Sequence, residues 1–162
     1  MDKVYVEATY KSLNKLNEEL CGDRVEIVKN DDSYFVVLSD GLGSGVKANI
    51  LSTLTSKIIS TMMFQGASIE DTVETIVHTL PVCSVRKVAY STFMILQISY
   101  DGNAYLVEFD SPGCIFVRDG RLMNIEYNYR SIAGKEIKEA HFKVKPDDFM
   151  MLLSDGVVYA GI

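Results

Sequence analysis

Phe35-Val36-Val37-Leu38-Ser39-Asp40-Gly41 is an apolar run that stops abruptly at an aspartate and a glycine. A near copy, Phe149-Met150-Met151-Leu152-Leu153-Ser154-Asp155-Gly156, occurs later in the chain. Each run has the length and composition of a buried β-strand. Two strands that end on an aspartate at the same edge of a sheet place two hard oxygen ligands together, and a cation between them offsets their repulsion. The repeated peptide therefore indicates a metal site.

Two unrelated turns are the alternative interpretation, because Asp-Gly is also a common hairpin turn. After Asp40-Gly41, however, apolar residues recur at steps of three and four between residues 48 and 64. That spacing predicts a helix rather than a returning strand. Elsewhere Asp101-Gly102 and Asp119-Gly120 are expected to be plain turns, so a single Asp-Gly carries little information.

The loop between the first Asp-Gly and the helix contains Gly43, Ser44 and Gly45. Glycines let the backbone approach an anion or a metal, and a helix N-terminus favours negative charge. The loop lacks the Gly-Lys-Ser/Thr ending of a P-loop and the third glycine of a dinucleotide fingerprint. A flexible strand-to-helix turn remains the alternative interpretation.

The rest of the pattern predicts one α+β domain over residues 1–162, built on antiparallel sheet. Gly66 is expected to cap the first helix, and Ser68 to be the N-cap of the second. The last six strands are expected to form three successive hairpins. Helices are predicted at 48–64 and from 68 to about 80, and strands at 4–10, 24–28, 34–39, 92–100, 104–110, 114–118, 121–126, 141–144 and 149–154.

Asp23 stands at the start of the strand predicted to pair, through the turn at 30–33, with the strand that carries Asp40. In such a hairpin both aspartates lie towards the same end, so they could share one metal centre. An aspartate at a strand start is also an ordinary turn residue. His78 and His141 have no nucleophile at meaningful spacing, so no catalytic triad is predicted.

Composition excludes several classes of protein. A net charge of −6 and the lack of a Lys/Arg block argue against nucleic-acid binding. The start of the chain lacks the apolar stretch of a signal peptide, and no apolar run is long enough to cross a membrane. Three cysteines without CxxC spacing indicate reduced thiols, so we expect a cytoplasmic protein.

Three motifs together carry a family resemblance: Cys21-Gly22-Asp23, then 39–45 with Ala48-Asn49 behind it, then Ser154-Asp155-Gly156-Val157. In this order they resemble the metal-dependent type 2C Ser/Thr phosphatases, in their bacterial SpoIIE branch with its RsbX-like enzymes. The resemblance implies two packed antiparallel sheets flanked by helices. It also implies two Mn²⁺ or Mg²⁺ ions and a metal-bound water as nucleophile.

The resemblance also implies roles for individual residues. Asp40 is the implied bridging ligand, and the Gly41 carbonyl is a backbone ligand to one ion. Asp155 is the implied ligand to the other ion, and Asp23 is an outer acidic ligand. Family members continue through a helix to a final strand with another metal-binding aspartate, whereas this sequence stops at Ile162. We therefore expect the C-terminal helix and strand to be lacking and one ion to be held weakly.

By resemblance, the expected activity is hydrolysis of phosphoserine or phosphothreonine on a regulatory protein in bacterial signalling. The expected partner is a phosphorylated regulator such as a STAS-type protein or an anti-sigma antagonist. Two alternatives remain open. One is a non-catalytic phosphatase-like binding module, and the other is a phosphohydrolase that acts on a small phosphorylated molecule.

Overall fold

The structure is a computed structural model and describes residues 3–13, 17, 20–41, 43, 45–80 and 91–158. The described residues form two main helices, which follow one another after the second strand, a short third helix at the end, and nine strands. The helices are α1 (Gly45–Phe64), α2 (Ile69–Thr79) and α3 (Asp155–Val158). The strands are β1 (Asp23–Lys29), β2 (Ser33–Gly41), β3 (Ser91–Ser99), β4 (Asn103–Phe109), β5 (Cys114–Arg118), β6 (Arg121–Leu122), β7 (Asn128–Ile132), β8 (Lys135–Lys143) and β9 (Phe149–Leu152).

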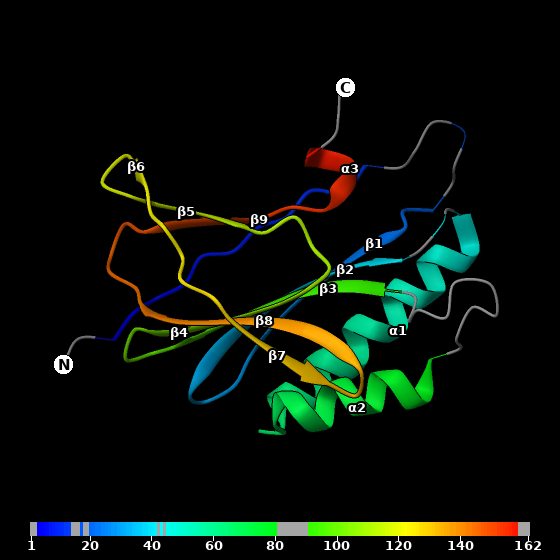
Figure 1. The fold of residues 1–162 in the computed structure, drawn as a ribbon. Helices are drawn as coiled ribbons and strands as arrows, with labels where there is room; N and C mark the ends of the chain where they lie inside the picture. The colour runs from blue at the N-terminus through cyan, green and yellow to red at the C-terminus, as the bar shows by residue number, and fades with distance from the viewer. Residues whose placement is uncertain are drawn as a thin grey trace.

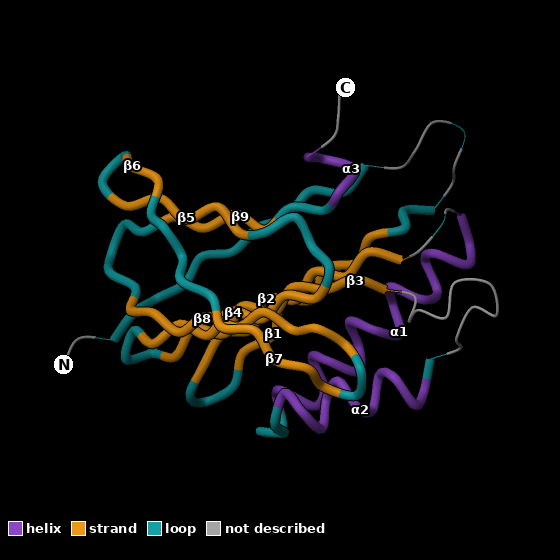
Figure 2. Tube along the Cα trace, viewed as in Figure 1, coloured by secondary structure: helices purple, strands orange, loops and turns teal. Residues whose placement is uncertain are grey.

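The strands form two antiparallel sheets. One sheet has six strands in the order β1-β2-β3-β4-β8-β7, and the other has three in the order β6-β5-β9. Helices α1 and α2 cover one face of the larger sheet, while the smaller sheet lies over its other face (Figures 1 and 2). The expected α+β architecture of two packed antiparallel sheets with flanking helices is confirmed.

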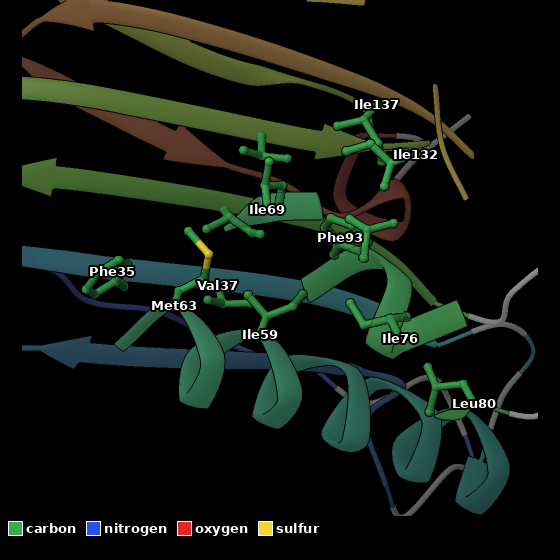
Figure 3. Packing of buried hydrophobic residues seen from close by; sticks show 13 residues of the cluster. Phe35, Val37, Ile59, Met63, Ile69, Ile76, Leu80, Phe93, Ile132 and Ile137 are labelled. Atoms are coloured by element: carbon green, nitrogen blue, oxygen red, sulfur yellow. The ribbon is translucent and has the colours of Figure 1, made fainter. Parts of the chain in front are cut away.

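A hydrophobic cluster fills the space between the helices and the larger sheet (Figure 3). Strand β2 sends Phe35 and Val37 into it, because alternate side chains of a strand point to one face. Helix α1 contributes Ile59 and Met63, at the helical spacing of four. Burial of this apolar surface is the main force that holds α1 and α2 against the sheet.

The ends of both helices confirm the predicted caps. Gly66 has φ +84°, and its N–H donates to the Met63 carbonyl at 3.0 Å. The Ser68 side chain accepts a hydrogen bond from the Asp71 N–H at 3.1 Å, as an N-cap serine does. Leu80 adopts an extended conformation and ends α2. Pro81, expected to stop this helix, lies outside the described residues.

The predicted third hairpin is wrong. Strand β8 pairs with β4 and β7 in the larger sheet, whereas β9 pairs with β5 in the smaller one. The turn at 145–148 therefore carries the chain from one sheet to the other. The Asp148 carboxylate accepts hydrogen bonds from the Lys145 N–H at 2.7 Å and from Arg118 of β5, which fixes the turn beside the smaller sheet.

Three further strand predictions differ from the structure. Residues 4–10 are extended but form no strand among the described residues. The Val4 N–H donates to the Tyr100 carbonyl at 2.7 Å. Val4 and Val6 pack against a second hydrophobic cluster, whose buried members are Leu96, Ile98, Ala104, Leu106, Ala140 and Val144. The strand expected at 121–126 is limited to Arg121–Leu122. Strand β7 and the first part of β8 were not predicted, because their polar residues lack clear alternation.

Candidate metal centre

Asp23 and Asp40 lie directly opposite each other in the antiparallel pair of β1 and β2. Side chains of directly opposed residues point to the same face of a sheet, with Cβ atoms roughly 5 Å apart. A cleft lies between the two sheets, and the pair Val25 and Leu38 lines it. These residues lie two positions from Asp23 and Asp40, so the aspartates are on the same face, towards the smaller sheet. The turn that sets this register is held by Asn30, whose side-chain oxygen accepts from the Asp32 and Ser33 N–H groups at 2.9 Å.

Gly41 ends β2 at a point where the backbone of α1 passes very close. A Cβ placed on Gly41 would lie 2.0 Å from the Ala48 carbonyl oxygen, so no larger residue fits. The Gly41 N–H donates to the Gly22 carbonyl at 2.9 Å. The backbone beside Asp40 is therefore held tightly between β1 and α1.

Two side-chain hydrogen bonds fasten α1 to this edge of the sheet. Asn49 of α1 donates from Nδ2 to the Cys21 carbonyl at 2.9 Å. Ser39 of β2 donates from Oγ to the Ser52 carbonyl at 2.6 Å, and both serines are buried. These bonds place the start of α1 against the segments that carry Asp23 and Asp40.

The glycine-rich loop is described in part. Gly43 has φ +90° and Gly45 has φ +70°, a backbone conformation that glycine adopts without strain. Gly45 is the first residue of α1, and both glycines line the cleft between the sheets. Ser44, the third residue predicted for this loop, lies outside the described residues.

The second Ser-Asp-Gly reaches the same cleft from the other sheet. After β9 ends, Asp155 begins α3, and it lines the cleft together with Asp23 and Asp40. The adjacent Ser154 donates from Oγ to Oδ2 of Asp23 at 2.8 Å. The topology thus brings together two motifs that are far apart in the sequence.

The cleft has a volume of about 1740 Å³ and is lined by the extended residues 3–13 as well as by both sheets. Within the described part of the chain, no three acidic, histidine or cysteine side chains gather closely enough to hold a metal ion. Asp23, Asp40 and Asp155 therefore share one cleft without forming a closed group of three. The donor set consists of carboxylates and a backbone carbonyl, which is the chemistry that Mg²⁺ and Mn²⁺ prefer.

Four acidic residues that were not predicted as site residues also line this cleft: Glu7, Asp110, Asp147 and Asp148. Asp110 follows β4 and lines the cleft, and it has φ +48°. It lies one residue beyond the Phe93–Phe109 pair, near Thr92, which pairs with Asp40. Its sequence, Asp110-Ser111-Pro112-Gly113, is typical of a turn, so no signal in the sequence distinguished it from one.

The structure describes two of the three cysteines. Cys21 and Cys114 are free, and burial raises the pKa of the Cys114 thiol to about 12. The Cys21 sulfur accepts from the Asp23 N–H at 3.4 Å, so this residue supports the local turn. Cys83 lies outside the described residues.

The comparisons with solved structures define the class of fold. The PP2C phosphatase domain of SpoIIE from Bacillus subtilis, with a fragment of its regulatory domain, matches with a TM-score of 0.78 and 20% identity over 92% of this chain. RsbX in complex with magnesium matches with a TM-score of 0.70 and 19% identity over 90% of this chain and 72% of RsbX. The RsbU and RsbW domains of a Mycobacterium tuberculosis protein match with a TM-score of 0.74 and 14% identity, over 91% of this chain and 43% of that one.

The chain therefore has the fold of PP2C phosphatases. The family model of Stage II sporulation protein E (SpoIIE) matches residues 30–161, and the chain belongs to this family. It spans 46% of the SpoIIE chain whose structure it matches. A search of curated proteins found no match. None of the described helices is both long and apolar enough to span a membrane.

Proposed function

We propose that this chain is a metal-dependent phosphatase domain that hydrolyses phosphoserine or phosphothreonine on a regulatory protein in bacterial signalling. The observation that supports it most directly is the opposed pair of Asp23 and Asp40 on the cleft face. Like charges directly opposite each other destabilise a strand pair. A divalent cation bound between the two carboxylates would offset that repulsion, so metal binding would explain why they stand opposite each other.

In this proposal Asp40 and the Gly41 carbonyl would hold one ion, and Asp40 and Asp155 would hold a second ion. Asp23 would act as an outer ligand. Two divalent ions, Mn²⁺ or Mg²⁺, would supply an activated water and neutralise charge on the phosphoryl oxygens. Gly43, Ser44 and Gly45 form the loop that would approach the ions or the phosphate. The protein's own contribution is to hold these oxygens at one edge of the two sheets.

The proposed substrate is a phosphorylated protein. RsbX, RsbU and RsbW domains occur among the similar structures, and another similar structure is described as part of the bacterial stressosome. These relatives support a phosphorylated regulator, of the STAS type or an anti-sigma antagonist, as the partner. We also propose that this role lies inside the bacterial cytoplasm.

A non-catalytic phosphatase-like binding module is the second candidate. It is favoured by the finding that Asp23, Asp40 and Asp155 do not form a closed group of three in the described residues. Such a module would bind a phosphorylated partner without turnover.

The test is an assay of phosphate release from a phosphoserine peptide, a phosphothreonine peptide and p-nitrophenyl phosphate, each with Mn²⁺, Mg²⁺ or EDTA. We expect phosphate release from the phosphopeptides only in the presence of metal, and we expect the Asp40→Asn variant to lose this release. Binding of phosphopeptide without release in any metal would favour the non-catalytic module. Release from p-nitrophenyl phosphate alone would instead indicate a phosphohydrolase of small molecules.

A further inference from the structure

Ser154 and Asp23 form a partly buried hydrogen bond that connects the segment after β9 to the start of β1 at the cleft. The Ser154 Oγ donates to Asp23 Oδ2 at 2.8 Å, and the two residues are separated by 131 positions in the chain. Ser154 is only 6% exposed. It follows β9 of the smaller sheet, whereas Asp23 is the first residue of β1 in the larger one.

The hydroxyl of Ser154 is not used for its own helix. Ser154 immediately precedes α3, and its carbonyl accepts from the Val157 and Val158 N–H groups at 3.1 and 3.3 Å. A serine at this position ordinarily accepts a hydrogen bond from the helix with its side chain. Here the side chain donates across the cleft instead, which indicates a role at the carboxylate rather than in helix capping.

The serine of the first Ser-Asp-Gly, Ser39, has a different hydrogen-bond partner. Ser39 donates to the Ser52 carbonyl and so attaches α1 to β2. The two serines therefore differ, although the two peptides look alike in the sequence. Ser154, in contrast, donates to a carboxylate of the candidate site.

We infer that Ser154 is a positioning residue for Asp23, an inference that rests on the metal site of the proposed function. The hydrogen bond occupies Oδ2 and so fixes the rotamer of the Asp23 side chain beside Asp40. Because the donor comes from the smaller sheet, the orientation of Asp23 depends on how the two sheets pack. Partners that orient metal ligands typically change metal affinity by about 10–100-fold when they are removed.

The experiment is a double-mutant cycle on the 162-residue chain. Parent, Ser154→Ala, Asp23→Asn and the double variant are titrated with Mn²⁺ by calorimetry, and unfolding by urea is measured in EDTA. We expect Ser154→Ala to weaken Mn²⁺ binding about 10–100-fold in the parent, and less than about 2-fold in the Asp23→Asn background. Ser33→Ala is the matched control, because it removes a buried hydroxyl at the other end of β2 that accepts from Gln97.

Several results would overturn the inference. Unchanged affinity in Ser154→Ala would show that the serine does not position a metal ligand. The same loss of affinity in both backgrounds would show that its effect on binding does not depend on Asp23. If Ser154→Ala does not fold, Ser154→Cys replaces it with a weaker donor of similar size, and the expectation is the same. A parent that binds no Mn²⁺ would remove the proposed metal site and this inference with it. A parent that binds normally while the cycle shows no coupling would remove the inference alone.

Discussion

Gly41 approaches Ala48 so closely that a Cβ on Gly41 would lie 2.0 Å from the Ala48 carbonyl oxygen. The same carbon would lie 2.7 Å from the carbonyl carbon, so the obstacle is backbone rather than a flexible side chain. A side chain at position 41 would therefore force α1 or β2 to move. The end of β2 and the start of α1 pack directly against each other, and this packing requires a glycine next to Asp40.

Gly41→Ala is accordingly expected to destabilise the domain by roughly 1–3 kcal/mol or more, the range for added volume at a well-packed position. It should also weaken Mn²⁺ binding, because the displaced backbone carries Asp40 and the Gly41 carbonyl. Urea unfolding and calorimetric titration measure the two effects. Gly156→Ala is the control, since a Cβ there meets nothing within 4 Å. Equal stability of the two variants would contradict the packing argument.

Asp40→Asn tests the central carboxylate. We expect metal-dependent phosphate release to fall by about 100-fold or more, which exceeds the effect typical of a supporting residue. The fold should be retained, because the substitution removes a negative charge opposite Asp23. Circular dichroism and Mn²⁺ titration accompany the assay. Asp31→Asn, at an exposed turn of the same hairpin, is the control. Parental metal binding and turnover in Asp40→Asn would reject Asp40 as the bridging ligand.

The edge that carries Asp23 and Asp40 could be predicted because it depends on local features. A short turn at 30–33 sets the register of β1 and β2, and a tight turn fixes which residues face each other. The helix after Gly45 is likewise encoded by spacing within one segment. These features need no knowledge of the rest of the fold.

The other half of the site depends on contacts between distant segments. The turn at 145–148 looks like any hairpin turn, yet the interaction of Asp148 with Arg118 places β9 in the other sheet. The bond between Ser154 and Asp23 likewise follows from the packing of two sheets. No local pattern encodes such contacts. The sequence therefore suggested that the two Ser-Asp-Gly motifs lie close together, but it did not indicate which contacts join them.

The pair formed by Asp148 and Arg118 should make stability depend on acid. Hydrogen bonds from Arg118 lower the pKa of Asp148 below its usual value of 3.8. A carboxylate with a lowered folded-state pKa contributes stability above the unfolded pKa, and this contribution is lost as the pH falls through the folded pKa. The effect is limited to the region below about pH 4. Because the Arg118 side chain is 20% exposed, solvent screens part of the attraction.

Asp148→Asn should therefore have a melting temperature a few degrees below the parent at pH 7, and this difference should shrink between pH 4 and pH 2. Differential scanning calorimetry at several pH values measures both trends. Asp147→Asn is the matched control, because Asp147 is an exposed neighbour in the same turn with φ +70°, which asparagine also tolerates. A difference that stays constant with pH would show that the charge of Asp148 is not what stabilises the turn.

Glu108 should make stability depend on pH in the opposite direction. It is 2% exposed, and its carboxylate oxygens make no well-formed hydrogen bond to a described residue, although Tyr127 and Ser111 lie near them. Burial raises the pKa of Glu108 above its usual value of 4.5, while Tyr127, Lys138 and Ser111 oppose this rise only in part. The folded protein thus keeps a proton that the unfolded chain releases. Stability consequently falls as the pH rises from about 4.5 through the folded-state pKa.

Glu108→Gln removes this ionisation and keeps the shape of the side chain. We expect the variant to match the parent in stability near pH 4.5 and to be more stable than the parent at pH 8. At pH 8 the folded parent must either keep Glu108 protonated or ionise it in a buried position, and both cost free energy that the variant does not lose. Urea unfolding at both pH values measures the difference. Glu139→Gln on the neighbouring β8 is the comparison: it weakens an ion pair with Arg130, and so should lower stability at pH 8. If Glu108→Gln is less stable than the parent at pH 8, Glu108 is ionised and well paired in the folded protein.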